Sequence, residues 1–149
     1  MDVESKLCRL VFDQRTGHFS IWDKGSGRKA IDYGMFGVWW RENGEDRHTF
    51  ISQLEQVEVE ETKETLRVTG RHNEGWNIVW EAKLSNELTG IEVKMRFENK
   101  SSKPIELVDM ILLEGEYIRP EGIADKWWVF ENGWQSWSPS VNRTGIRSS

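Results

Sequence analysis

The residues with the clearest chemical potential lie in one short segment near the end of the printed sequence. Asn132 is followed, after one glycine, by Trp134, Gln135, Ser136 and Trp137. Indole faces can stack on the C–H faces of sugar rings, and amides and hydroxyls can exchange hydrogen bonds with sugar hydroxyls. Because the two tryptophans are three residues apart, they would point to opposite sides of an extended strand. We therefore expect one to anchor the segment and the other to meet a carbohydrate.

The structural alternative is that these tryptophans only cap a hydrophobic core. The chain has nine tryptophans against two tyrosines and six phenylalanines, and a β core built on large aromatics accounts for most such residues. The adjacent pairs Trp39-Trp40 and Trp127-Trp128 should each place one ring inward and one outward. We expect the outward rings to pack against another domain, so sugar binding applies to few of the nine.

The order Asn-Gly-Trp-Gln-Ser-Trp-Ser over residues 132–138 resembles a signature of family 36 glycoside hydrolases. These are the α-galactosidases (melibiases) and their raffinose-processing relatives. In that family the signature ends an N-terminal β-sandwich and precedes the catalytic barrel. The resemblance implies a galactose-mutarotase-like supersandwich over residues 1–125. It also implies that residues 126–149 form a final strand and a Trp-Gln-Ser-Trp loop leading to a barrel absent from this chain.

The resemblance implies roles for single residues as well. Trp137 would form part of the wall around the terminal galactose, and Trp134 would pack beneath it. Asn132, Gln135 and Ser136 would hold the loop or touch the substrate indirectly. The chain alone would be inactive, because the two aspartates of the retaining double displacement belong to the barrel.

The resemblance further implies the partners of the whole enzyme. It would remove terminal α-linked galactose from melibiose- or raffinose-type oligosaccharides, with no metal or organic cofactor. The barrel of the same polypeptide would be the main partner, and self-association into a homo-oligomer is expected. Relatives include both hydrolases and galactosyl transferases, so the choice between hydrolysis and transfer stays open.

No catalytic or metal-binding residue is assigned from the residues themselves. The acidic residues nearest the motif are expected to be solvated, as carboxylates on sheet edges and loops usually are: Asp109, Glu114, Glu116, Glu121 and Asp125. The three histidines, His18, His48 and His72, lack ligand-like spacing. The single cysteine, Cys8, has no disulfide partner and is expected to be a small buried apolar residue.

Composition narrows the function classes. The net charge of −5 argues against nucleic acid, for which a basic face is expected. No run of about 18 apolar residues predicts a membrane span, and the first eight residues lack the features of a signal peptide. We expect a cytoplasmic protein with no membrane partner. Its 149 residues suit one domain and fall short of the roughly 200 residues that a (β/α)₈ barrel needs.

Period-two alternation predicts an all-β antiparallel sandwich with almost no helix. Strands are expected over residues 7–12, 18–23, 30–41, 48–52, 56–60, 65–71, 76–84, 91–97, 105–114 and 126–130. Asn43-Gly44 is a hairpin turn, and Gly34 and Gly37 mark a bulge or a close backbone approach. Residues 115–125 and 140–149 are expected to be loops.

Two further functions compete with the glycosidase interpretation. A stand-alone carbohydrate-binding module of the β-sandwich type would explain the same tryptophans, and it requires sugar affinity in the isolated chain. A scaffold domain would bury its exposed tryptophans against a partner, independently of sugar.

Overall fold

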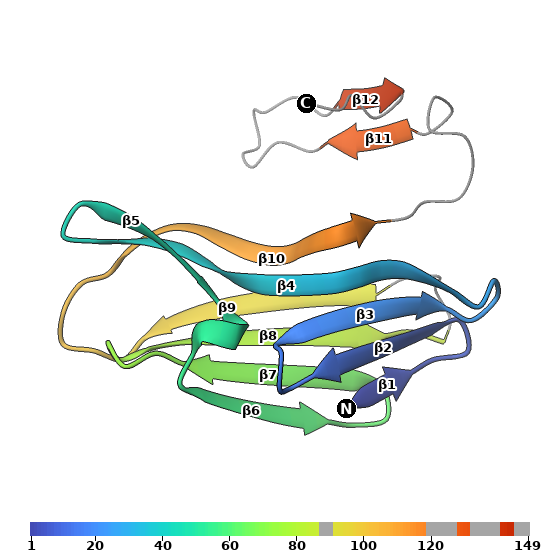
Figure 1. Ribbon diagram of the computed structural model, residues 1–149, viewed down its shortest axis with the longest axis horizontal. Coiled ribbons are helices and arrows are strands. Elements are labelled where there is room, and N and C mark those ends of the chain that lie inside the picture. The colour runs from blue at the N-terminus through green and yellow to red at the C-terminus, as the bar shows by residue number, and fades with distance from the viewer. Residues whose placement is uncertain (87–90, 119–127, 132–140, 145–149) are drawn as a thin grey trace. The chain divides into compact units, whose positions relative to one another are not determined.

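The computed structural model describes residues 1–86, 91–118, 128–131 and 141–144. It divides into two compact units, Met1–Arg119 and Pro120–Ser149. In the first unit, two antiparallel sheets are stacked face to face (Figure 1). The expected all-β sandwich with almost no helix is confirmed. No helix among the described ranges is long and apolar enough to cross a membrane.

The first sheet has six strands in the order β1-β2-β3-β4-β10, with β5 also pairing with β4. Their bounds are β1 (Asp2–Glu4), β2 (Cys8–Asp13), β3 (His18–Asp23), β4 (Arg28–Glu42), β5 (Glu45–Phe50) and β10 (Glu106–Ile118). The long strand β4 organises this sheet. Its first half pairs with β3 and its second half with β5, whereas β10 runs along its other side.

The second sheet is a four-stranded antiparallel meander in the order β6-β7-β8-β9. Its strands are β6 (Gln56–Glu61), β7 (Thr65–Arg71), β8 (Trp76–Leu84) and β9 (Ile91–Asn99). A 3₁₀ turn, η1 (Ile51–Gln53), carries the chain from β5 to β6. Ile51 and Leu54 are buried at this crossing, and a Cβ on Gly70 would overlap the Cδ1 atoms of both. The glycine therefore lets the crossing pack directly on β7.

The core lies between the sheets because alternate residues of each strand face inward. From the first sheet come Leu10, Phe12, Phe19, Phe36, Val38 and Trp40, and from the second come Leu66, Val68, Trp76, Ile78, Trp80, Ala82 and Leu84. The opposite face of the second sheet carries charges, for example the Arg67–Glu81 pair at 2.7 Å. This in-and-out pattern is the one expected from the sequence.

Trp80 joins the two sheets at the centre of the core. Its ring stacks on Phe36 with centroids 4.6 Å apart and planes 7° apart. Its Nε1 donates a hydrogen bond to the carbonyl oxygen of Leu112, at 2.9 Å. Leu112 lies in an irregularity of the β4–β10 ladder, where the register shifts between Ile111 and Glu114. A bulge that takes this carbonyl out of the regular ladder thus makes it an acceptor for the facing sheet.

The two strand glycines behave as expected. Gly34 lies under the ring of Phe19, whose nearest atoms would overlap an added Cβ. An added Cβ on Gly37 would instead meet the backbone of Thr49 and Phe50. At Asn43 and Gly44 the φ angles are 52° and 80°, which confirms the predicted hairpin turn between β4 and β5.

Three differences from the expected elements stand out. The strand β1 was not predicted, because its three residues are mostly polar, although Val3 is buried. The loop expected from residue 115 is wrong as far as Ile118, since β10 continues and Gly115 pairs with Gly34. The loop expected over residues 140–149 is wrong at β12 (Val141–Thr144).

The strand β12 belongs to the second unit, where it pairs antiparallel with β11 (Trp128–Glu131). Ladder hydrogen bonds join backbone groups, so a strand can form on a polar segment that has no alternation to reveal it. The strand expected over residues 126–130 corresponds to β11.

Candidate functional site

The expected sugar-contacting residues lie outside the described residues: Asn132, Trp134, Gln135, Ser136 and Trp137. The residues that flank their segment in sequence are Glu131 and Val141, which pair with each other in the β11–β12 ladder. The interpretation of these five residues therefore stays a prediction.

The first tryptophan pair follows the expected in-and-out arrangement. Trp40 is only 5% exposed, and its Nε1 donates to Thr49 Oγ1 at 2.9 Å. Trp39 is half-buried on the opposite side of β4, where its ring centroid lies 5.1 Å from that of His48. The Trp39 Nε1 atom is enclosed and has no hydrogen-bond partner in the structure as described. In the second pair, Trp127 lies outside the described residues and Trp128 is described only as part of β11.

Of the five acidic residues nearest the motif in sequence, the structure describes the side chains of two, Asp109 and Glu114. Asp109 Oδ1 accepts a hydrogen bond from the backbone N–H of Met110, at 2.8 Å, and Glu114 is exposed. The backbone alone is described for Glu116, whereas Glu121 and Asp125 lie outside the described residues. Within the described ranges, no group of three His, Cys, Asp or Glu residues could hold a metal ion.

Cys8 is half-buried and packs against the core. Burial raises the pKa of its thiol, and the negative charge of Asp23 raises this pKa further. A raised pKa keeps the sulfur in its unreactive thiol form at neutral pH. The cysteine therefore has a packing role, as the sequence indicated.

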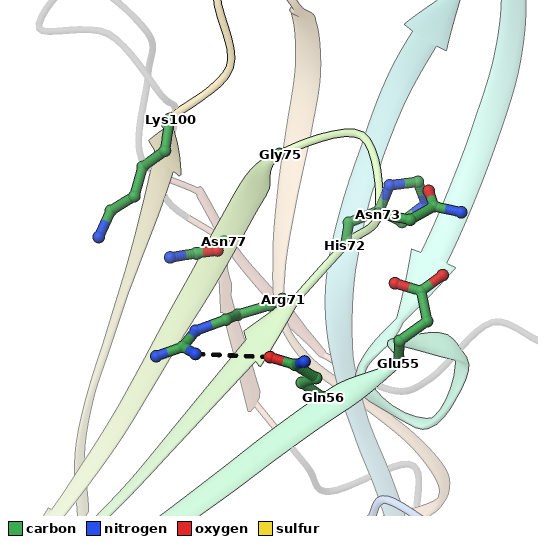
Figure 2. Close-up of a pocket in the computed structure, with 8 residues that line it drawn as sticks. All are labelled: Glu55, Gln56, Arg71, His72, Asn73, Gly75, Asn77 and Lys100. Carbon is green, nitrogen blue, oxygen red and sulfur yellow. Dashed lines mark hydrogen bonds between the residues drawn. The ribbon is translucent and has the colours of Figure 1, made fainter.

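A groove at one end of the second sheet is lined mainly by polar and charged residues. Its volume is about 680 Å³, and its lining consists of Glu55, Gln56, Arg71, His72, Asn73, Gly75, Asn77 and Lys100 (Figure 2). We call this site the amide groove, since it contains three side-chain amides.

Strand register places three of these residues in a row. Gln56 pairs with Arg71, and Arg71 pairs with Asn77, across β6, β7 and β8. Paired residues of antiparallel strands point to the same face, which here is the face away from the core. Their sequence neighbours Gly70 and Trp76 are buried on the other face. The alternation that builds the core therefore also aligns the groove.

The β7–β8 turn completes the amide groove. The backbone N–H of Gly75 donates to the carbonyl oxygen of His72, at 3.0 Å, and Gly75 has a φ of 89°, which suits glycine. The backbone N–H of Lys100 donates to the carbonyl oxygen of Gly75, at 2.9 Å. This bond ties the end of β9 to the turn and holds Lys100 beside the groove.

An aromatic stack supports the turn from the core side. The His72 ring lies on Trp76 with centroids 4.5 Å apart and planes 4° apart, and the Trp40 ring meets His72 edge-on at 5.4 Å. His72 Nδ1 accepts a hydrogen bond from the backbone N–H of Glu74, at 3.1 Å. His72 is thus fixed by packing and by this bond, which makes it a structural wall of the groove.

The two cations of the groove make long, exposed ion pairs. Arg71 Nη1 lies 3.4 Å from Glu58 Oε1 and 3.4 Å from Gln56 Oε1, and Lys100 Nζ lies 3.7 Å from Glu98 Oε2. Asn77 differs from them, since it is only 8% exposed. Its side-chain amide makes no hydrogen bond with the described residues. The arrangement can bind a polar ligand, but it offers no activated nucleophile.

The sequence did not reveal this site. Asn77 stands between Trp76 and Ile78 and reads as an ordinary outward-facing polar residue of an alternating strand. Two structural features distinguish Asn77 from other outward-facing polar residues. It pairs with Arg71 in the β7–β8 ladder, and it is only 8% exposed. No protein-family model matches this chain, and no curated protein matches it.

Proposed function

We propose that this chain is the sandwich domain of an α-galactosidase-like retaining glycoside hydrolase, whose catalytic barrel would follow it in the whole protein. In this proposal the chain supports the barrel, and Trp137 lines the subsite for the terminal galactose. The observation that carries the proposal is the residue order Asn-Gly-Trp-Gln-Ser-Trp-Ser, which follows a two-sheet antiparallel sandwich in the chain.

Core packing explains several of the tryptophans, so sugar binding need apply to only a few of them. Trp40, Trp76 and Trp80 are buried between the two sheets, so core packing accounts for three of the nine tryptophans. Trp22 lies half-buried on β3, with Lys29 Nζ 5.1 Å from its ring centroid. Three of the five tryptophans of the sandwich are therefore core residues, and the proposal assigns the sugar contact to the motif.

The test is the exchange Trp137→Ala in the whole protein that contains this chain. A sugar ring that stacks on Trp137 in the transition state loses about 1–3 kcal/mol when the indole is removed, by analogy with base stacking on aromatic residues. We therefore expect kcat/KM on an aryl α-galactoside to fall roughly 5- to 150-fold.

Trp22→Ala is the matched control, because it removes a half-buried indole from the sandwich and should leave kcat/KM unchanged. Unchanged kcat/KM in the Trp137→Ala enzyme would remove this residue from the galactose subsite. Analysis of the products of the wild-type reaction distinguishes hydrolysis, which releases free galactose, from galactosyl transfer, which forms a new galactoside.

A further inference from the structure

We propose that the outer edge of strand β10 is a docking site for an extended segment of a partner protein in which basic and apolar residues alternate. The segment would add a strand to the first sheet through main-chain hydrogen bonds, and its side chains would contact both faces of β10. The proposal does not rest on the glycosidase function, because it uses no residue of the segment 132–137.

The position of β10 leaves one side of its backbone without a strand partner among the described residues. It is the last strand of the first sheet and pairs with β4 alone, along which it runs in Figure 1. An edge strand presents N–H and C=O groups that can pair with another chain. With 13 residues, β10 is the longest edge strand that the structure describes.

The composition of β10 gives this edge little of the usual protection. Edge strands are commonly protected by lysine, by proline or by being short, and β10 contains neither a basic residue nor a proline. Five large apolar side chains are exposed among the described residues, and β10 carries two of them, Leu107 and Leu112, each 37% exposed. A long edge with exposed apolar side chains favours pairing with a further strand.

Strand pairing shows that one face of β10 is apolar and the other acidic. Leu107 and Met110 pair with buried core residues of β4, so they lie on the face toward the core. Asp109 and Glu114 pair with residues on the outer face of β4. A strand beside β10 would therefore place its alternate side chains next to apolar and acidic neighbours, which alternating apolar and basic residues match best.

Two carboxylates of β10 make no ion pair with the described residues, namely those of Asp109 and Glu114. Glu106 differs, because its Oε1 atom lies 2.8 Å from Arg41 Nη1. Asp109 is half-buried, and its Oδ1 atom accepts a hydrogen bond from the backbone N–H of Met110. Lysine or arginine on an added strand would supply the missing cations across the strands.

The other long edge strands are neutralised within the chain, which distinguishes β10 from an ordinary solvated edge. On β9 the charged side chains pair with each other, and on β6 two glutamates pair with arginines of β7, at distances between 2.7 and 3.6 Å. Within the described ranges, neither strand carries an exposed large apolar side chain. Exposed leucines and unpaired carboxylates therefore occur together on β10.

One alternative is that irregular pairing alone keeps this edge unoccupied. The register of β10 against β4 shifts between Leu107 and Asp109 and between Ile111 and Glu114, and bulges can discourage pairing with another strand. The ladder is nevertheless regular from Asp109 to Ile111 and from Glu114 to Ile118. The bulges also give no reason for the exposed leucines or the unpaired carboxylates.

A second copy of this chain is the other candidate occupant. Pairing one β10 with another would set the four acidic residues of each strand against those of its partner. Like charges on neighbouring strands are destabilising. The charge of β10 therefore favours a basic segment over self-association.

The experiment measures binding of the synthetic peptide Val-Lys-Val-Arg-Val-Lys-Val-Arg to the full 149-residue chain by fluorescence anisotropy and locates it by hydrogen exchange. We expect saturable binding, with slower exchange of backbone amides in β10 and no change in β6 or β9. A peptide of the same composition with its basic residues in one run should bind at least tenfold more weakly. So should a peptide N-methylated at each backbone nitrogen, because it lacks main-chain donors.

Three results of this experiment would overturn the proposal. The first is no saturable binding of the alternating peptide. The second is equal binding of the rearranged or the N-methylated peptide, which would show attraction by charge without strand pairing. The third is protection of amides in another strand in place of β10.

A matched pair of double variants tests the carboxylates. Asp109→Asn combined with Glu114→Gln removes two negative charges and keeps the acceptor for the N–H of Met110, and it should weaken binding at least fivefold. Glu58→Gln combined with Glu60→Gln removes the same charge from β6 and should leave the affinity within twofold. Equal losses in the two double variants would contradict a site on β10.

A second matched pair tests the apolar face. Leu107→Lys places a lysine on the edge and should weaken peptide binding at least tenfold. Leu7→Lys is its control, because Leu7 is 36% exposed and lies outside β10. The thermal unfolding midpoint shows whether each variant is folded, and Leu112→Lys replaces Leu107→Lys if the latter is not. Unchanged affinity in the folded β10 variant would overturn the proposal.

Sedimentation velocity of the chain without peptide separates the two occupants. We expect no dimer that depends on β10. A dimer that Leu107→Lys dissociates would assign this edge to a second copy and overturn the proposal. Trp137→Ala should bind the peptide like the wild type, so loss of galactoside turnover and loss of peptide binding report on different proposals.

Discussion

At the residue scale, Gly37 shows how closely the first sheet is packed. An added Cβ there would meet the backbone of Thr49 and Phe50 on β5, and a backbone cannot move aside as a flexible side chain can. We expect Gly37→Ala to lower the free energy of unfolding by about 1–3 kcal/mol, as overpacking does elsewhere.

Urea unfolding followed by tryptophan fluorescence measures this loss. Gly25→Ala is the control, because a Cβ at Gly25 would make only an ordinary contact 3.5 Å from Asp23 Oδ1. Its effect should stay within about 0.5 kcal/mol. Equal stability of Gly37→Ala and the wild type would show that β4 and β5 separate more easily than the structure indicates.

Asn77 shows the limit of sequence reasoning at this scale. Alternation correctly placed it on the outer face of β8, between the buried residues Trp76 and Ile78. The pattern could not show that Asn77 would be only 8% exposed, or that strand pairing would place it beside Arg71 in one groove. Local pattern therefore fixes which way a side chain points, but not what covers it.

At the scale of elements, strand β8 offers a matched pair of tryptophans. Trp76 and Trp80 are both fully buried, but the Trp80 Nε1 donates to Leu112 whereas the Trp76 Nε1 has no partner among the described residues. Trp80→Phe therefore leaves the Leu112 carbonyl without its partner, and Trp76→Phe removes an unpaired donor.

We expect Trp80→Phe to destabilise the chain by about 1–3 kcal/mol more than Trp76→Phe, which is the usual cost of an unsatisfied buried group. Both exchanges remove the same volume, so each serves as the control for the other in chemical unfolding. If Trp76→Phe proves as costly as Trp80→Phe, the hydrogen bond to the β10 bulge does not tie the two sheets together.

The strands themselves were largely predictable. Residues 18–23, 65–71 and 76–84 form strands with the bounds that alternation predicted, since each has one buried and one solvated face. Where this contrast is missing the prediction failed, as in the polar strand β12 and at the end of β10, which continues through Gly115. The bulge at Leu112 was also unpredictable, because it depends on the register between β4 and β10.

At the scale of the whole molecule, the outer strands of the second sheet are protected by charge. The strand β6 is rich in glutamate, and β9 carries ion pairs such as Lys94–Glu92 and Arg96–Glu98. Such exposed pairs contribute little stability, but charged edges discourage pairing with another chain. The charges on β6 and β9 thus disfavour edge-to-edge association with another chain, whereas the residues that face the first sheet are apolar.

We propose that the sandwich serves a retaining α-galactosidase. The most direct test is to incubate the whole protein that contains this chain with an aryl α-galactoside and to identify the first galactose released by proton NMR. We expect release of the α-anomer, which mutarotates afterwards, because double displacement retains configuration. Initial release of the β-anomer, or no hydrolysis and no galactosyl transfer by the folded whole protein, would contradict this proposal.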